Sequence, residues 1–148
     1  MEEITIYTDG ACSGNPGKGG WASVIICGQK EIELSGGEKL TTNNRMELMA
    51  AIQALARIDA DSELRSCKIT LITDSQYVKN GITQWISNWK KNNWKTASKA
   101  PVKNQDLLIK LDELCAKLSV QWSWVKGHAG NKYNEICDTL AVQAASAQ

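Results

Sequence analysis

The sequence has no hydrophobic run long enough to cross a membrane. Its longest apolar stretch, residues 21–27, is far shorter than the ~20 residues that a bilayer requires. A secretion signal is missing too, because Glu2 and Glu3 stand where such a signal carries positive charge. We therefore expect a protein that does not span a membrane, is not secreted and works in the cytoplasm.

No Cys-x-x-Cys pair occurs among the five cysteines, so the sequence contains neither a zinc knuckle nor a thioredoxin-like redox motif. An odd number of cysteines without an export signal favours free thiols in a reducing compartment. The simplest role for them is that of small buried apolar residues, rather than redox or metal chemistry. They are Cys12, Cys27, Cys67, Cys115 and Cys137.

Net charge is nearly absent as well, at +1 for the whole chain. Its distribution is uneven, because residues 75–105 contain six lysines and no acidic residue. A local basic island on a nearly neutral protein is typical of an interaction surface.

The chain has the size of one ordinary domain, since 148 residues can bury roughly 68–70% of their unfolded surface. Alternation with a period of two predicts strands, and apolar residues spaced three and four apart predict helices. The predicted strands are 4–8, 21–27, 30–34, 68–73 and 120–126. The predicted helices are 46–58, 75–86, 105–118 and a last one carrying Tyr133, Cys137, Leu140 and Ala144.

The order of these elements favours one α/β domain over residues 1–148, with a mixed sheet flanked by helices. The first three strands have short connections and are expected to form an antiparallel meander. Asn43 or Asn44 is placed to cap the first helix. Asp9 and Gly10 are expected to end the first strand, and residues 10–20 to form a glycine-rich loop.

The glycine-rich segment does not match either common phosphate-binding template. Gly17 and Lys18 are followed by Gly19 instead of Ser or Thr, and no Gly-x-Gly-x-x-Gly occurs. The segment is either a loop that passes close to a ligand or a wide turn between strands.

Four acidic residues lie at junctions between predicted elements. Each has an ordinary structural explanation: an Asx turn, a capping box with Asn44, a helix cap or a solvated helix position. In chain order the four are Asp9, Glu47, Asp74 and Asp138.

Together the acids suggest a metal site, because adjacent parallel strands would bring Asp9 and Asp74 to the same carboxyl edge of the sheet. Clustered carboxylates repel one another unless they hold divalent cations, and Mg²⁺ prefers oxygen ligands. Two-metal phosphodiester hydrolysis is the chemistry that uses such a cluster. His128 is the only histidine and is flanked by glycines; it is either incidental or a group that moves protons or helps product release.

Motifs along nearly the whole chain resemble those of the bacterial type I ribonuclease H family. They are YTDGACSGNPG (7–17), TTNNRMELMAAI (41–52), TDSQYV (73–78), GITQWI (81–86), WVKGHAG (124–130) and NEICDTLA (134–141).

The resemblance implies a ribonuclease H-like fold, in which a five-stranded mixed sheet has three antiparallel strands and two parallel additions. It also implies hydrolysis of the RNA strand of RNA–DNA hybrids, leaving a 5′-phosphate and a 3′-hydroxyl, by a monomer with no obligate protein partner. The metal ligands would be Asp9, Glu47, Asp74 and Asp138, with Mg²⁺ as the ion and Mn²⁺ as a possible substitute. His128 would be the loop histidine near the scissile phosphate.

Substrate contacts follow from the same resemblance. Thr42 would grip a phosphate of the DNA strand, and residues 85–103 would form a basic protrusion. An A-like hybrid displays its 2′-hydroxyls in a shallow minor groove, so cleavage should be largely independent of sequence. The minor-groove contacts would be Cys12, Asn15, Asn43, Asn44 and Gln76, and the protrusion contacts Trp85, Trp89, Lys90 and Lys91.

The residues alone leave several alternative interpretations open. The lysines of the protrusion could be a solvated face over packed tryptophans, with Trp85 and Trp94 partly structural. A transposase or integrase domain, a hybrid-binding module without catalysis, or acids that act only as caps would each fit part of the pattern. Two departures from the family pattern are a longer connection at 59–66 and the sequence Asn-Lys-Tyr at 131–133.

Overall fold

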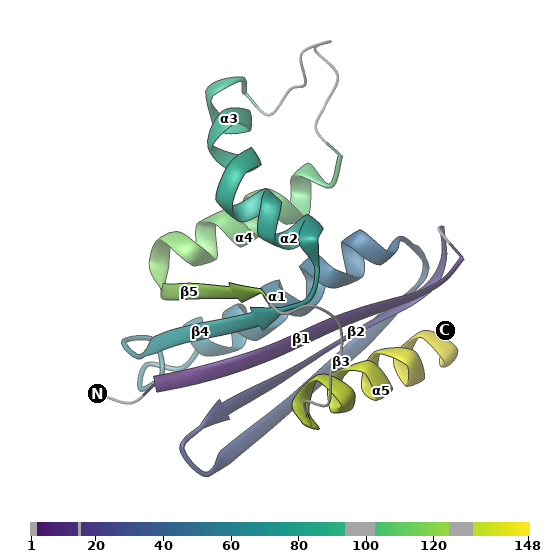
Figure 1. Cartoon of the computed structure of the whole chain (residues 1–148), viewed down its shortest axis with the longest axis horizontal. Helices are drawn as coiled ribbons and strands as arrows, with labels where there is room; N and C mark the ends of the chain where they lie inside the picture. The colour runs from purple at the N-terminus through teal and green to yellow at the C-terminus, as the bar shows by residue number, and fades with distance from the viewer. Residues whose placement is uncertain (1–2, 15, 94–102, 125–131) are drawn as a thin grey trace.

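A computed structural model describes residues 3–14, 16–93, 103–124 and 132–148, and Figure 1 shows one five-stranded sheet with the strand order β3-β2-β1-β4-β5. β1 pairs antiparallel with β2, and β2 with β3, whereas β4 and β5 add to β1 in parallel. The predicted α/β fold, with three antiparallel strands and two parallel additions, is therefore confirmed. The strands are β1 (Glu3–Gly14), β2 (Gly17–Cys27), β3 (Lys30–Thr41), β4 (Lys68–Thr73) and β5 (Ser119–Trp124).

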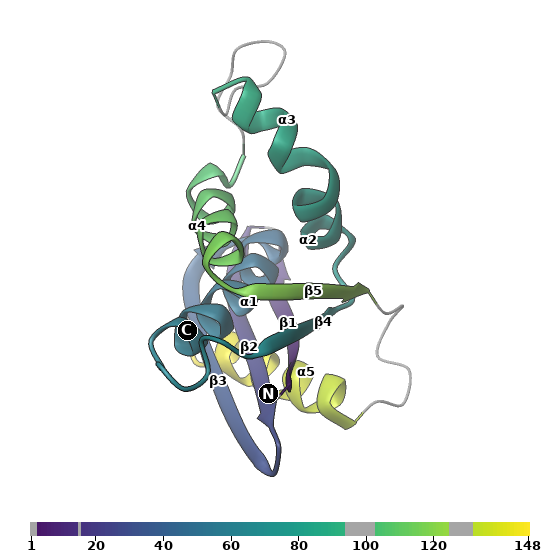
Figure 2. The same cartoon turned by 90° about the vertical axis from the view of Figure 1, so that its left-hand side faces the viewer.

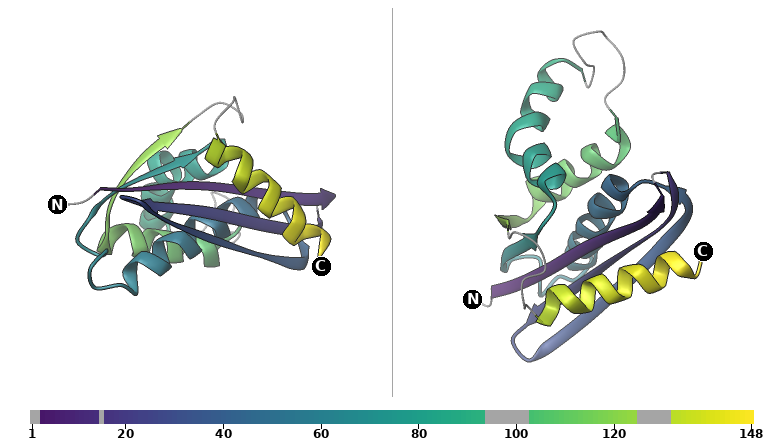
Figure 3. Two further views of the ribbon diagram at one scale, coloured as in Figure 1. Left: turned by 90° about the horizontal axis from the view of Figure 1, so that it is seen from below. Right: turned by 45° about the vertical axis from the view of Figure 1, so that its right-hand side comes forward.

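Helices cover both faces of the sheet. Figure 3 shows α5 (Lys132–Ser146) along one face, whereas α1 (Asn43–Asp59) and α4 (Gln105–Lys117) lie on the other. The larger hydrophobic cluster includes Leu48, Leu55, Leu108 and Leu111, and a smaller one lies beneath α5. The apolar stripes read from the sequence therefore face the core.

In the chain between β4 and α4, consecutive helical segments lead away from the sheet (Figure 2). It consists of α2 (Gln76–Asn80), a π-helical turn at Gly81–Trp85 and α3 (Ile86–Lys91). None of the helices in the described ranges combines the length and the hydropathy needed to cross a lipid bilayer.

The glycine-rich segment is a strand hairpin, so the predicted loop over residues 10–20 is wrong. β1 continues past Asp9 to Gly14, and β2 begins at Gly17. Glycine weakens the strand signal, but packing requires it here, because a Cβ at Gly20 would lie 2.2 Å from the Ala141 carbonyl oxygen on α5. The same effect hides the far end of β3, which runs to Thr41 instead of ending near residue 34.

The cap of α1 also differs from the prediction. Thr42 is the N-cap, since its hydroxyl accepts a hydrogen bond from the Arg45 backbone N–H at 3.3 Å. Asn43 and Asn44 are instead the first two residues of the helix, and both are exposed. Both residues therefore lie at the surface at the start of α1.

All five cysteines are free thiols, as expected, and Cys67 and Cys137 are buried. Burial raises the pKa of Cys115 to about 11 and that of Cys137 to about 12. These two thiols stay protonated near neutral pH and are therefore poor nucleophiles.

Two glycine substitutions should change stability in opposite directions. Gly20→Ala should lower the free energy of unfolding by about 1–3 kcal/mol, because the added methyl group overpacks the contact between β2 and α5. Gly81→Ala should raise it by about 0.4–1 kcal/mol, because Gly81 has helical dihedral angles and its Cβ would make only ordinary contacts, the nearest at 3.4 Å from Leu108. Urea unfolding measures both, and equal effects of the two substitutions would contradict the packing described for Gly20.

Candidate active site

Three of the four predicted acidic residues meet at one edge of the sheet. Asp9, Glu47 and Asp74 each offer a carboxylate oxygen, and these oxygens all lie within 4.8 Å of one another. The parallel ladder between β1 and β4 ends at the pair Tyr7 and Ile72, so Asp9 and Asp74 both lie just past its end. The sheet topology therefore brings the two aspartates together as predicted, and α1 supplies Glu47.

Gly10 allows α1 to approach β1 so closely. A Cβ at this position would lie 2.7 Å from the Glu47 backbone nitrogen and 2.8 Å from the Met46 carbonyl carbon. Any larger residue would push the helix, and with it Glu47, away from Asp9. This role of Gly10 was not predicted from the sequence, in which the available signal is a glycine directly after an acidic residue on a strand.

Burial makes the group of carboxylates electrostatically costly. Asp9 is 4% exposed and Glu47 is 5% exposed, whereas Asp74 is half-buried. Desolvation, followed by the charges of Asp9 and Asp74, raises the pKa of Glu47 well above its usual range, and a hydrogen bond from the Gly10 backbone opposes this only in part. A bound divalent cation would offset the repulsion, and three carboxylate oxygens are the donors that Mg²⁺ prefers.

The carboxylates line a polar hollow of about 360 Å³ together with side chains from the starts of two helices. Asn43 and Asn44 come from the first turn of α1, and Gln76 from the first turn of α2. Three of the predicted substrate contacts therefore share one hollow with the three acids. Gly10, Ser75 and Tyr77 complete its lining.

Asp138 does not join this group. It is exposed on α5, and its carboxylate is not among the oxygens that cluster within 4.8 Å. The neighbouring Cys137 is buried, and its thiol donates a hydrogen bond to the Tyr7 carbonyl at 3.3 Å, two residues before Asp9. His128 and Asn15 lie outside the described residues.

Two other predicted substrate contacts already have partners within the protein. The Cys12 thiol donates to the Thr41 carbonyl at 3.4 Å, which joins β1 to the end of β3. The Thr42 hydroxyl caps α1, as described above. Their roles toward substrate stay predictions.

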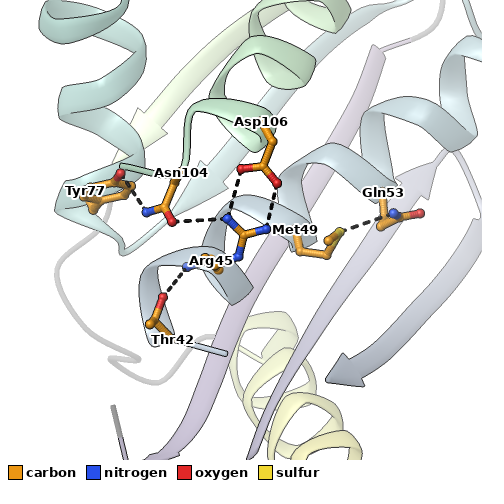
Figure 4. A network of polar contacts seen from close by, with 7 residues as sticks. All are labelled: Thr42, Arg45, Met49, Gln53, Tyr77, Asn104 and Asp106. Atoms are coloured by element: carbon orange, nitrogen blue, oxygen red, sulfur yellow. Dashed lines mark hydrogen bonds and ion pairs between the residues drawn. The ribbon is translucent and has the colours of Figure 1, made fainter. Parts of the chain in front are cut away.

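A polar network fixes the start of α1 against α2 and α4 (Figure 4). Arg45 donates to both carboxylate oxygens of Asp106, at 2.8 and 3.0 Å, and to the Asn104 side-chain oxygen at 3.3 Å. Asn104, whose backbone is left-handed with φ of 60°, donates to the Tyr77 hydroxyl at 3.0 Å. The pKa of Asp106 is lowered, chiefly by the hydrogen bond from Arg45.

The described part of the predicted protrusion is built on packed aromatic rings. Trp85 makes an edge contact with Tyr77 at 5.5 Å between ring centroids, and Trp89 lies 5.6 Å from Trp85. Lys90 and Lys91 are both exposed, and Lys90 also forms an ion pair with Asp112 at 3.1 Å. Residues 94–102, including Trp94, lie outside the described residues.

Comparisons with known proteins identify the family to which this chain is similar. The family model for RNase H matches residues 1–146. Ribonuclease H of Hydrogenovibrio crunogenus is 58% identical over 144 residues, which are 97% of this chain and 96% of that protein. Ribonuclease HI of Pseudomonas aeruginosa strain PAO1 is 60% identical over 140 residues, which are 95% of this chain and 91% of that protein. The crystal structure of LC9-RNase H1, a type 1 RNase H with the type 2 active-site motif, superposes with a TM-score of 0.87 at 31% identity, covering 100% of this chain and 74% of that chain.

Replacing Glu47 with glutamine should stabilise the protein when divalent ions are chelated. The variant removes a desolvated charge beside Asp9 and Asp74, so its free energy of unfolding at pH 7 should rise above that of the wild type. Since the folded state holds the Glu47 proton more tightly, the wild type should lose stability as the pH rises from about 4.5 through the raised pKa, and the variant should not show this component.

Urea unfolding in EDTA over a pH series measures this effect, with Glu113→Gln on the exposed side of α4 as the control. Added Mg²⁺ should then stabilise the wild type more than Glu47→Gln, because binding to the folded state adds to its stability. Parallel pH curves for wild type and Glu47→Gln would contradict the assigned cause.

Proposed function

The chain belongs to the ribonuclease H family, and from this premise we propose that it hydrolyses the RNA strand of RNA–DNA hybrids at the hollow between β1, α1 and α2. The observation that carries the proposal is the group formed by Asp9, Glu47 and Asp74, which lies in one hollow with Asn43, Asn44 and Gln76. The products would be a 5′-phosphate and a 3′-hydroxyl. The whole of residues 1–148 would form the catalytic domain, with the protrusion at about 85–103.

Asp9, Glu47 and Asp74 would hold divalent cations, with Mg²⁺ as the preferred ion and Mn²⁺ as a possible substitute. Two such ions, when bound, supply an activated water and stabilise the leaving oxygen of the phosphodiester. The protein contributes preformed ligands, of which Asp9 and Glu47 are almost fully buried. This preorganisation is the part of catalysis that the described residues carry.

Asp138 would be the fourth ligand, and His128 would move protons at the scissile phosphate. For Asp138, the support is the contact of its neighbour Cys137 with the strand that carries Asp9. For His128, the support is the resemblance of the motif around it and the near-neutral pKa that is usual for an imidazole.

Selection of a hybrid over DNA would depend on the amides in the hollow. Asn43, Asn44 and Gln76 have donors and acceptors that can bind 2′-hydroxyls in a wide minor groove. Cys12 and Asn15 would extend this contact, and Thr42 would hold a phosphate of the DNA strand. Because these groups contact sugars and backbone, cleavage should tolerate most sequences.

The protrusion would bind the hybrid beyond the cleavage site. In this proposal Lys90 and Lys91 neutralise phosphates, and the packed rings of Trp85 and Trp89 support the segment that bears these two lysines. We also propose that the enzyme works as a monomer, as the family resemblance implies. We also place the enzyme in the cytoplasm, because its proposed substrate is an RNA–DNA hybrid.

Asp74→Asn should abolish cleavage and preserve hybrid binding. The substitution removes a metal ligand but keeps the size of the side chain, so the rate should fall at least about 100-fold, the upper range for residues that only support a ligand. A gel assay with labelled RNA, annealed to DNA or to RNA, with Mg²⁺ or EDTA, measures cleavage and strand choice together. A binding titration of the same hybrid measures affinity.

Asp59→Asn, at the far end of α1, is the matched control and should cleave normally. If the wild type binds hybrids tightly but does not cut them in Mg²⁺, the protein is a binding module and the proposed activity is wrong.

Lys91→Ala should reduce the salt dependence of hybrid binding. Each neutralised phosphate releases counterions, so the slope of log affinity against log salt should become less steep by about one. Affinity measured from low to high NaCl gives the slopes, and Lys117→Ala at the end of α4 is the control, with the wild-type slope expected. An unchanged slope for Lys91→Ala would remove Lys91 from the interface.

A further inference from the structure

We infer that Trp124 is a positioning residue that holds Asp74 in place to bind metal. The indole Nε1 of Trp124 donates a hydrogen bond to the backbone carbonyl of Asp74 at 3.1 Å. The inference rests on the proposed function, since it assigns to Trp124 a role in the same site.

The sheet by itself does not hold Asp74. The parallel ladder between β4 and β5 ends at the pair Thr73 and Trp124, and Asp74 lies one residue beyond it. At that point the chain leaves β4 and turns into α2. The indole of Trp124, in the last pair of the ladder, reaches the first residue beyond it and extends the fixed backbone by one position.

Two further hydrogen bonds fix the chain on either side of this contact. The Ser75 backbone N–H donates to the Thr73 hydroxyl at 3.1 Å, and the Val78 backbone N–H donates to the Ser75 hydroxyl at 3.2 Å. With both neighbours of Asp74 held in this way, the carbonyl between them is the group that the indole restrains. Loss of the indole donor would free the peptide unit from which the Asp74 side chain projects.

The indole itself is held from the side of α2. The Lys79 ammonium lies 5.1 Å from the centroid of the Trp124 ring, within the range of a cation–π contact. Trp124 therefore contacts both ends of the segment from Asp74 to Lys79. This arrangement couples the end of β5 to the orientation of a metal ligand.

Trp122 provides a matched comparison on the same strand. It lies two residues before Trp124, is also half-buried, and packs against the larger hydrophobic cluster. Phenylalanine at either position keeps an aromatic ring and removes the indole donor. The donor matters for Asp74 at position 124 alone, so the two substitutions separate positioning from packing.

The test measures Mg²⁺ dependence in wild type, Trp124→Phe and Trp122→Phe by two methods. The first is the rise in Tm with Mg²⁺ in the absence of substrate, and the second is the rate of hybrid cleavage at each Mg²⁺ concentration. In Trp124→Phe, the half-saturating Mg²⁺ concentration should rise about 10-fold by both methods, the scale found when a group that orients a ligand is lost. KM for the hybrid should stay unchanged, because the substrate contacts remain.

Trp122→Phe should lower the Tm and leave the half-saturating Mg²⁺ concentration at the wild-type value. Equal Mg²⁺ dependence of the two variants would overturn the inference. If Trp124→Phe does not unfold cooperatively, replacing the indole of Trp124 with benzothiophene keeps the bicyclic shape without the donor and should give the same 10-fold shift. If the wild type binds Mg²⁺ but cuts no hybrid, the proposed function fails while the Tm measurement still decides the role of Trp124.

Discussion

The approach of buried carboxylates at one edge of the sheet is the constraint on which the rest of this structure depends. Asp9 and Glu47 are almost fully buried, and one carboxylate oxygen from each of them and from Asp74 lies within 4.8 Å of the other two. Without cations their mutual repulsion and desolvation oppose folding, as the raised pKa of Glu47 indicates. The two hydrophobic clusters on either side of the sheet must offset this cost, and Gly10 must stay small enough for α1 to approach.

Local signals predicted the strands and the three acidic residues that cluster, whereas the two parallel additions to the sheet were implied by the resemblance to the ribonuclease H family. Alternation marked the strands, and the rule that parallel strands share a carboxyl edge predicted that Asp9 and Asp74 lie together. The glycine-rich hairpin was missed for a physical reason. Its glycines allow close contacts, as Gly20 does with α5 and Gly10 with α1, and they remove the hydrophobic alternation by which a strand is recognised.

Local sequence patterns do not predict contacts between residues that are far apart in the chain. The ion pair of Arg45 with Asp106 joins positions 61 residues apart, and neither residue stands in a context that indicates the other. The choice of Thr42 over Asn43 as the cap of α1 had a similar cause. Both residue types are good caps, so composition alone does not decide which one occupies the position.

The two sides of the hollow are held by contacts that lie outside it. Arg45 and Asn104 fix the start of α1, which carries Asn43 and Asn44, while Trp124 holds the turn that carries Asp74. A site whose ligands repel one another tends to open when no ion is bound, and each freed side chain would then have to be ordered again on binding. The contacts outside the hollow reduce that entropic cost, because they keep the repelling carboxylates from moving apart. Residues that never touch an ion therefore contribute to the affinity of the site alongside the carboxylates that bind it.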